Sequence, residues 1–565
     1  MNYLEKAQLW KNNKNLEASL KAELDQMTDA DLKEAFTTDL EFGTGGLRGI
    51  LGAGTNRMNI YIVEKATLGF GRYLLKQSSV AQAMGVAISH DNRHKSIEFA
   101  RKSAEVLSSL GFRVFLFSSL RPTPELSYAV RNFKCIGGIM ITASHNPKEY
   151  NGYKIYDETG CQLVPHMADK VIEEINQIDD YFNIETGLNH DLIYYIGKDV
   201  DEKYIKDVKQ IIMRSDLPKD FKLVYTPLHG TGQVFIPDVL KSVGYDVTPL
   251  PCQMTCDPDF SGVKTSNPEN KEAYDEAIAL AKALGAKIVL ATDPDADRLG
   301  IAVLHNGEYV LLTGNQTATI VFDYICKTRK EMGTLPSDGY MFTTNVSSTL
   351  PEAIAKKYGL KTQITLTGFK FIGEKAHQMV DQGMGSYVFG FEESYGCLVS
   401  PIVRDKDSVQ ACLMLCETAA YYYTQGKDLV EALEDIYKEY GYYEEGITNI
   451  VMKGLEGKAK IDRVMDFFRT TDIALKGFKI LAKDDVKLSV HTDYTNDDKK
   501  TKIELPSSNV IKYYLNDEMW FVLRPSGTEP KLKVYYEAVG KTKEEALKKI
   551  DELKNEVLSI VDMIK

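Results

Sequence analysis

The amino-acid sequence predicts an α/β fold, with three related α/β domains that have mixed sheets and a C-terminal α+β domain around a central cleft. Three observations lead to this prediction. The 565 residues, 44% of them hydrophobic, are enough for about four compact units at the usual domain size. One pattern of strand, polar loop, helix and second strand occurs three times. A different pattern, two strands around a glycine turn and then a long helix, ends the chain.

The repeated pattern first occurs at 84–89 (MGVAIS), which is typical of a buried strand. It continues through the polar loop HDNR and a helical pattern to a second strand at 112–117. The second copy begins with a strand at 221–226 and the third with a strand at 339–344. Because helices that alternate with short apolar strands are typical of βαβ units, we expect three related α/β domains.

In each copy, a later strand ends abruptly in a polar loop. The loops are TASHNP (142–147), TDPDADR (292–298) and GFEESYG (390–396). Ligands of α/β sheets bind at the carboxyl ends of strands, which is where these loops fall. The sequence therefore predicts that the three loops face one shared cleft.

The C-terminal part follows another pattern. Residues 520–539 are expected to form a strand, a glycine turn and a second strand, and an amphipathic helix is expected from about Thr542 to Met563. This arrangement indicates an α+β unit. The predicted domains are residues 1–206, 207–312, 313–443 and 444–565.

Charge and hydropathy exclude several classes of protein. Lys and Arg total 68 against 80 Asp and Glu, a formal net charge of −12, which argues against a nucleic-acid binder or a basic membrane-surface protein. The sequence has no apolar run of about 18 residues, and its first residues lack the apolar core of a signal peptide. We therefore expect a cytoplasmic protein with no membrane and no nucleic-acid partner. The eight cysteines lack the spacing of a zinc site and are expected to be reduced thiols.

Three aspartates alternate directly after the apolar strand IVLA: Asp293, Asp295 and Asp297. Carboxylates so close together repel one another unless a cation lies among them, and hard divalent ions such as Mg²⁺ take oxygen ligands. The loop is therefore predicted to bind metal, and the adjacent Arg298 is predicted to face the same anionic ligand. A solvated acidic turn is the alternative.

Ser144 follows another apolar strand, and its small neighbours are expected to leave the hydroxyl accessible as a nucleophile or phosphoryl carrier. A serine that only caps a turn is the alternative. His145 is not favoured as its base, because adjacent side chains rarely point at each other in an extended loop. Lys154 is a candidate proton shuttle or phosphate clamp, against the alternative of an ordinary surface lysine.

Two further loops suggest ligand contacts. Arg524 and the following Ser-Gly-Thr turn supply the guanidinium, hydroxyl and amide groups that bind a phosphate monoester; a simple hairpin turn is the alternative. Glu392 and Ser394 could hydrogen-bond vicinal sugar hydroxyls, although a plain polar loop would look the same.

The motifs TASHNP, DPDADR, GFEES and RPSGTEP, in this order and with FGTGGLRG near the start, resemble the α-D-phosphohexomutase superfamily of phosphoglucomutases and phosphomannomutases, in its long-chain branch. The resemblance covers essentially the whole chain. It implies four domains around a cleft, an active-site phosphoserine and Mg²⁺.

The resemblance also implies a role for each matching residue. Ser144 carries the phosphoryl group and binds Mg²⁺ together with Asp293, Asp295 and Asp297. Lys154 and Arg48 contact the transferring phosphate or assist proton transfer, and Arg298 stabilises its charge. The residues implied in sugar and ligand contacts are Thr367, Gly368, Lys370, Glu392, Ser394 and Lys406. Those implied in holding the non-reacting phosphate are Arg524, Ser526, Gly527 and Thr528.

The activity implied is that of an isomerase-class intramolecular phosphotransferase. It would interconvert glucose 1-phosphate and glucose 6-phosphate through glucose 1,6-bisphosphate, which would also serve as activator. GFEES is more similar to the glucose-type loop than to the GEMSGH loops of glucose/mannose enzymes, but phosphopentomutases share GFEE. Phosphopentomutase and phosphomannomutase activities are therefore the alternatives. Sugar phosphates are the expected partners, and a monomer or homodimer is the expected state.

Two alternatives from other classes use the same loops. A metal-dependent hydrolase would share Ser144 and the aspartates, but it would not need RPSGTEP to hold a second phosphate. A non-catalytic sugar-phosphate-binding protein would tolerate the loss of Ser144 or of an aspartate, and none is lost.

Overall fold

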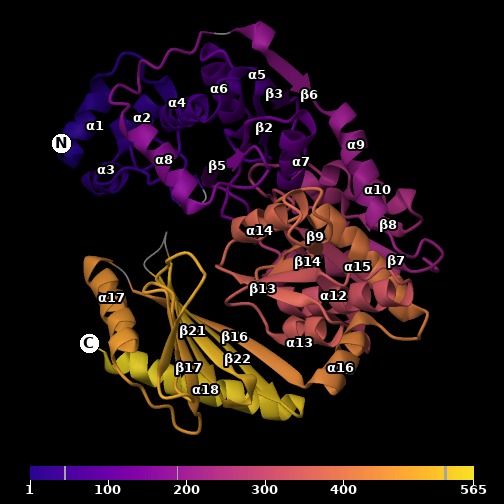
Figure 1. Ribbon diagram of the computed structural model, residues 1–565. Coiled ribbons are helices and arrows are strands. Elements are labelled where there is room, and N and C mark those ends of the chain that lie inside the picture. Colours follow the sequence, from indigo (N-terminus) through magenta and orange to yellow (C-terminus); the bar gives the residue numbers. More distant parts are fainter. Residues whose placement is uncertain (44–45, 188, 453, 527–530, 565) are drawn as a thin grey trace. The chain divides into compact units, whose positions relative to one another are not determined.

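The protein forms two compact units in a computed structural model (Figure 1). The structure describes residues 1–43, 46–187, 189–452, 454–526 and 531–564. The first unit comprises Met1–Phe342 and Gly368–Val430, and the second comprises Thr343–Thr367 and Glu431–Lys565. The boundary between the units interrupts the third α/β region, so the four predicted domain ranges stay predictions.

The first sheet has six strands in the order β1-β5-β4-β2-β3-β6. They are β1 (Leu47–Ile50), β2 (Val86–His90), β3 (Val114–Phe117), β4 (Gly137–Ile141), β5 (Tyr150–Asp157) and β6 (Ile193–Ile196). Strands β4, β2, β3 and β6 are parallel, whereas β1 and β5 pair antiparallel. The sheet is therefore mixed.

Helices cover both faces of this sheet. The helices of the region are α4 (Ile60–Gln77), α5 (Ala81–Met84), α6 (Ser96–Ser109), α7 (Thr123–Phe133) and α8 (Pro165–Asn176). On β4, a side chain at Gly137 would meet Phe70 of α4, whereas one at Gly138 would meet Val130 of α7. Because successive residues of a strand face opposite sides, α4 and α7 lie on opposite faces.

Three helices precede the first sheet and were not anticipated from the sequence. They are α1 (Tyr3–Asn12), α2 (Ala18–Gln26) and α3 (Asp29–Phe36). They enclose a small aromatic core in which Trp10, fully buried, packs edge-on against Phe36 and Phe182. This core attaches the first residues of the chain to α4 and to the segment after α8.

The second sheet has the order β11-β10-β9-β7-β8 and is also mixed. Its strands are β7 (Lys222–Thr226), β8 (Asp246–Pro249), β9 (Ile288–Thr292), β10 (Leu299–His305) and β11 (Glu308–Leu312). The helices of this region are α9 (Lys198–Val208), α10 (Ile236–Ser242), α11 (Asp275–Leu284) and α12 (Gly314–Glu331). Strand β9 ends at the triple-aspartate loop.

The third sheet has the order β13-β12-β14-β15. Its strands are β12 (Gly339–Thr344), β13 (Lys361–Thr365), β14 (Ser386–Glu392) and β15 (Gly396–Leu398). Strand β14 is parallel to β12 and antiparallel to β15. The helices of this region are α13 (Leu350–Lys357), α14 (Phe369–Asp381) and α15 (Ser408–Tyr423).

The second unit contains an antiparallel sheet of seven strands in the order β16-β22-β21-β20-β17-β18-β19. They are β16 (Tyr442–Val451), β17 (Ile480–Asp485), β18 (Val490–Asp493), β19 (Lys499–Lys502), β20 (Ile511–Leu515), β21 (Trp520–Pro525) and β22 (Lys531–Gly540). The helices near this sheet in the sequence are α16 (Leu429–Tyr440), α17 (Gly454–Thr470) and α18 (Lys543–Met563). Phe468 of α17 and Leu553 of α18 share one core with the sheet, and Figure 1 shows α18 lying along it.

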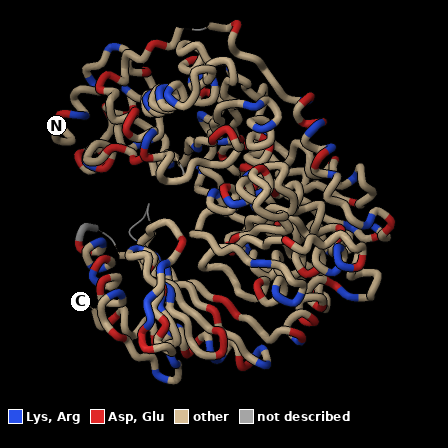
Figure 2. The backbone as a smooth tube through the Cα atoms, in the orientation of Figure 1, with Lys and Arg blue, Asp and Glu red and all other residues tan. Residues whose placement is uncertain are grey.

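The predicted fold class is confirmed, because three mixed sheets with helices precede an antiparallel sheet with helices. Acidic and basic residues are interspersed along the backbone of both units (Figure 2). Among the helices that the structure describes, none has the length and apolar character needed to cross a membrane.

A buried carboxylate connects α13 to the antiparallel sheet of the second unit. Glu537 is fully buried on β22, where it accepts hydrogen bonds from the Trp520 indole at 2.7 Å and from the main-chain N–H of Thr349 at 3.0 Å. Lys512 Nζ lies 4.3 Å from the centre of the Trp520 ring. Removal of the carboxylate would leave these donors buried without an acceptor.

We expect Glu537→Ala to lower the free energy of unfolding of the second unit by about 3 kcal/mol. The chain has two tryptophans, so Trp520 fluorescence in a Trp10→Phe background reports urea unfolding of this unit. Glu544→Ala, at an exposed position of α18, is the control. A loss below about 1 kcal/mol, as for an ordinary surface change, would contradict this role.

Candidate active site

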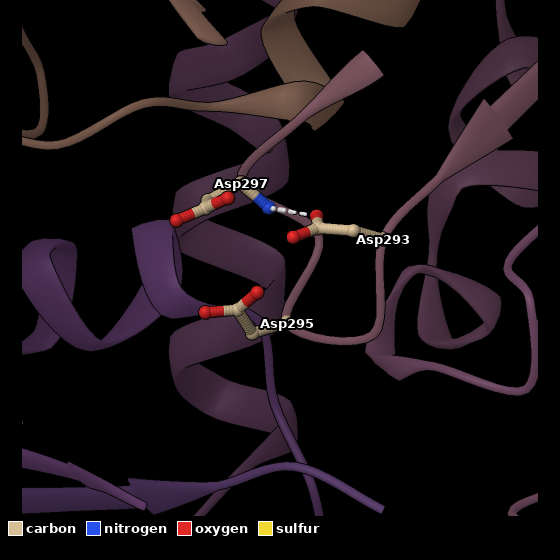
Figure 3. A group of neighbouring side chains, drawn as sticks. All are labelled: Asp293, Asp295 and Asp297. Carbon is tan, nitrogen blue, oxygen red and sulfur yellow. Dashed lines mark hydrogen bonds between the residues drawn. The ribbon is translucent and has the colours of Figure 1, made fainter. Parts of the chain in front are cut away.

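The three aspartates of the loop after β9 converge on one point (Figure 3). Asp293, Asp295 and Asp297 are buried, and one oxygen from each carboxylate lies within 4.8 Å of the others. Ala296 has a φ of 51°, which turns the backbone so that the carboxylates face one another. Asp293 Oδ1 accepts the main-chain N–H groups of Asp297 at 3.1 Å and of Arg298 at 3.0 Å. The loop is thus wound around Asp293.

Two oxygens of this cluster suit a cation. Asp295 Oδ1 and Asp297 Oδ1 are buried and have no hydrogen-bond partner among the described residues. A buried carboxylate oxygen without a partner is costly, and hard divalent cations prefer such oxygen ligands. The donor set therefore fits Mg²⁺.

Two lysines provide counter-charge to the cluster. Lys154 Nζ of β5 lies 2.8 Å from Asp295 Oδ2, and Lys406 Nζ lies 3.1 Å from Asp297 Oδ2. Although burial opposes its ionisation, Asp295 has a pKa below the ordinary value because Lys154 adjoins it. Burial and the neighbouring carboxylates raise the pKa of Asp293 well above its ordinary value.

Ser144 lies beside the aspartates. It comes shortly after β4, and its Oγ donates to Asp293 Oδ2 at 2.8 Å. The serine has a φ of 52°, in the left-handed region that non-glycine residues rarely adopt. The expectation of an accessible hydroxyl is wrong, since Ser144 is only 2% exposed. Its turn directs the side chain inward, against Asp293.

His145 is closer to the serine than the sequence suggested. Its Nδ1 lies 3.2 Å from Ser144 Oγ, because the left-handed turn at Ser144 brings the two adjacent side chains together. Burial and the nearby Arg298 and Arg48 hold the pKa of His145 well below its ordinary value. The imidazole beside the serine is therefore neutral near pH 7.

The GFEES loop adjoins the triple-aspartate loop through the backbone. The main chain of Gly396 pairs with Arg298, and Leu299 N–H donates to the Tyr395 carbonyl at 3.0 Å. Glu392 is buried, with Oε1 3.9 Å from Lys406 Nζ, and burial raises its pKa. Ser394 is half-buried in the same turn.

Both predicted arginines of the first unit lie near these loops. Arg48, exposed on β1, donates to Asn146 Oδ1 at 3.1 Å. Arg298 donates to Glu269 Oε1 at 2.7 Å, and its Nε lies 3.8 Å from Asp297 Oδ1. The two guanidinium groups therefore bring positive charge to the serine and aspartate loops.

The predicted sugar contacts at 367–370 lie at the start of α14. Gly368 precedes the helix with a φ of 114°, a conformation that favours glycine. Lys370 is buried on the first turn, and burial lowers its pKa to about 8. Thr367 belongs to the second unit.

The predicted phosphate clamp lies in the second unit. Arg524 is half-buried near the end of β21, with Nη1 3.5 Å from the Tyr535 hydroxyl. Ser526 N–H donates to the Lys531 carbonyl at 2.8 Å. Gly527 and Thr528 lie outside the described residues.

Sequence reasoning missed three residues that hold these loops. Thr123, at the start of α7, donates through Oγ1 to Asp295 Oδ2 at 3.0 Å. Glu269 binds Arg298, and Arg93 binds the serine loop. Only Arg93 had a signal, because the polar loop HDNR follows a buried strand as the recognised loops do.

Four family models match the chain. They describe the alpha/beta/alpha domains I, II and III and the C-terminal domain of phosphoglucomutase/phosphomannomutase, at residues 39–182, 202–307, 313–440 and 474–553. The chain belongs to the phosphoglucomutase/phosphomannomutase family. The resemblance to the α-D-phosphohexomutase superfamily is thereby confirmed.

Relatives within the family extend over nearly the whole chain. A phosphoglucomutase of Staphylococcus epidermidis is 38% identical over 528 residues, 92% of this chain and 94% of the relative. A phosphoglucomutase of Staphylococcus aureus is 38% identical over 535 residues, 94% of each chain. The protein is thus a phosphohexomutase, an enzyme of the isomerase class.

Solved structures of the family share the fold. A putative phosphomannomutase from Thermus thermophilus matches with a TM-score of 0.67 at 23% identity, over 93% of this chain and 99% of that one. Paramecium pp63/parafusin, a phosphoglucomutase, matches with a TM-score of 0.68 at 18% identity, over 93% and 95% of the two chains. At these identities the comparison concerns the fold alone.

We expect Mg²⁺ to raise the melting temperature of the protein and Asp297→Asn to remove most of this effect. A ligand at about 100 times its Kd stabilises by about 2.7 kcal/mol, and the variant loses one carboxylate of the three. The rise in melting temperature is measured by thermal melts across a magnesium chloride series, in which potassium chloride keeps the ionic strength constant. Asp259→Asn, at an exposed aspartate, is the control; an equal magnesium response in Asp297→Asn would exclude the cluster as the site.

Proposed function

We propose that the protein is a phosphoglucomutase that interconverts glucose 1-phosphate and glucose 6-phosphate through glucose 1,6-bisphosphate, with Ser144 as the phosphoryl carrier. The observation that carries this proposal is the contact of Ser144 Oγ with Asp293, at 2.8 Å, inside a cluster of buried carboxylates. The phosphoglucomutase relatives at 38% identity support the same activity.

The proposed reaction consists of two transfers in opposite directions. Phosphoser144 gives its phosphoryl group to the free hydroxyl of a glucose monophosphate: the bond from Ser144 Oγ to phosphorus breaks, and a new oxygen–phosphorus bond forms on the sugar. The sugar hydroxyl loses its proton, and Ser144 Oγ gains one. The bisphosphate then turns over and returns its other phosphoryl group to Ser144.

Each part of the site has a task in this reaction. Ser144 and the three aspartates would hold Mg²⁺, which when bound supplies positive charge that lowers the repulsion between the phosphate and the carboxylates. Lys154, Arg48 and Arg298 would stabilise charge on the transferring phosphoryl group. Glu392, Ser394, Lys406, Lys370, Gly368 and Thr367 would contact the sugar or its phosphate. The turn at Arg524, Ser526, Gly527 and Thr528 would hold the phosphate that is not reacting.

Glucose phosphates are the preferred substrates in this proposal because of the GFEES loop and the phosphoglucomutase relatives. Ribose phosphate is the second candidate, since the GFEE stretch is also typical of phosphopentomutases. Mannose phosphate is the third. We further propose that the enzyme acts in the cytoplasm, as a monomer or a homodimer, on free sugar phosphates.

Ser144→Ala is expected to abolish mutase activity. The assay contains glucose 1-phosphate, Mg²⁺ and a trace of glucose 1,6-bisphosphate, and it follows both glucose 6-phosphate and free phosphate. Because alanine cannot accept the phosphoryl group, we expect a loss of at least about 10³-fold in kcat, while a cooperative thermal melt without added magnesium shows that the fold is kept.

A control variant and two further measurements distinguish the proposed mutase from a hydrolase and from mutases with other substrates. Ser108→Ala, at a buried serine on α6, controls for loss of a buried hydroxyl. Release of free phosphate alone by the wild type would indicate a hydrolase, and full activity of Ser144→Ala would exclude Ser144 as the carrier. Ranking glucose, ribose and mannose phosphates by kcat/KM identifies the substrate.

The KM of the wild type for glucose 1-phosphate is expected to rise above about pH 8, by up to about tenfold per pH unit. Burial lowers the pKa of Lys370 to about 8, so its amine is charged below this pH and neutral above it. A neutral amine loses its attraction for phosphate. Lys370→Arg stays charged and should flatten the profile; parallel profiles in the two proteins would contradict a role for Lys370 in binding.

A further inference from the structure

One buried arginine binds the backbone on both sides of the serine. Arg93 follows β2, the strand next to β4 in the sheet. Its two terminal nitrogens donate to main-chain carbonyl oxygens of the loop 144–150. The acceptors are Ser144 O at 2.6 Å, Pro147 O at 2.7 Å, Tyr150 O at 3.1 Å and Asn146 O.

Arg93 is itself held from its other sides. Its Nε lies 3.3 Å from Asp91 Oδ2, and both side chains are fully buried. Asp91 Oδ1 accepts the main-chain N–H of Arg93 at 2.9 Å and the hydroxyl of Ser96 at 2.6 Å. The ring centre of Phe260 lies 5.1 Å from the guanidinium carbon. The guanidinium therefore has one position and one orientation.

We propose that Arg93 is a positioning residue for phosphoryl transfer, which holds the Ser144 loop in the turn that directs the hydroxyl at the aspartates. The inference rests on the proposed role of Ser144 as the phosphoryl carrier. All four terminal N–H groups of Arg93 are occupied by the loop, and its Nε lies 3.3 Å from Asp91 Oδ2. The two terminal nitrogens of Arg93 therefore act on the loop backbone.

The chemistry of the contact requires arginine. A guanidinium has five N–H donors in a fixed plane, whereas a lysine ammonium has three donors on one atom. A lysine at this position keeps the charge but cannot reach both ends of the loop at once. Replacing Arg93 thus frees the carbonyls of the loop, and Ser144 can then relax from the left-handed conformation, which is unfavourable for a residue other than glycine.

The cost of this arrangement suggests a role beyond stability. A fully buried ion pair is often no more stabilising than apolar residues of similar volume. Arg93 and Asp91 are placed next to the nucleophile loop, where a displacement of about 1 Å can reduce a rate about 100-fold. The buried pair is therefore best explained by the precision it gives to Ser144.

The test compares Arg93→Lys and Arg93→Ala with Arg101→Lys and Arg101→Ala, because Arg101 is exposed on the neighbouring α6. We expect kcat to fall about 100-fold in both Arg93 variants, with the KM for glucose 1-phosphate within about twofold of the wild type. The rate of Ser144 phosphorylation by glucose 1,6-bisphosphate, followed by intact mass, should fall in parallel. Added guanidinium ion should restore part of kcat to Arg93→Ala and none to Arg93→Lys.

Other outcomes are equally informative. An Arg93→Lys variant with wild-type kcat and phosphorylation rate would overturn the inference, and so would a raised KM at unchanged kcat, which indicates a direct ligand contact. Loss of the cooperative melt in both Arg93 variants would also overturn it, in favour of a general structural role. A wild-type protein that forms no phosphoserine would instead refute the proposed function, and the inference with it.

Discussion

The arrangement of the first unit depends on the repulsion among three buried carboxylates. Asp293, Asp295 and Asp297 lie within 4.8 Å of one another and away from water, where such charges cannot remain without compensation. Two lysines from different parts of the chain supply the compensating positive charge. Lys154 belongs to the first sheet, and Lys406 belongs to the segment after the third sheet. Charge compensation therefore connects three regions that the sequence separates widely.

The topology explains why these regions can meet. Each functional segment lies at the end of a strand of a mixed sheet: the serine loop follows β4, the aspartate loop follows β9, and GFEES comprises the last three residues of β14 and the turn after it. The serine loop meets the aspartate loop where Ser144 contacts Asp293, and the aspartate loop meets the GFEES segment where Arg298 pairs with Gly396. Polar side chains can therefore gather at these strand ends without disrupting the apolar cores, which lie between the helices and the sheets.

The sequence predicted the fold class and the loops because both depend on local pattern. Apolar runs, glycine turns and alternating aspartates leave a signal within a few residues. Thr123 and Glu269 leave none, since each matters through one partner far along the chain, and the polar loop that contains Arg93 does not reveal which backbone it binds. The burial of Ser144 was mispredicted because it depends on a left-handed turn that small neighbouring residues permit but do not require. The helices before Phe36 were missed for another reason, as they contain many charged residues and only a small core.

Two buried lysines show how environment divides one residue type into two roles. Lys406 lies among Asp297, Asp405 and Glu392, which raise its pKa above the ordinary value against the effect of burial. Burial instead dominates at Lys370 and lowers its pKa to about 8. The first amine is thus a permanent counter-charge to these carboxylates, whereas the second loses its charge as the pH rises through about 8. A net charge of −12 is compatible with phosphate binding because individual surroundings, rather than the total, decide where positive charge resides.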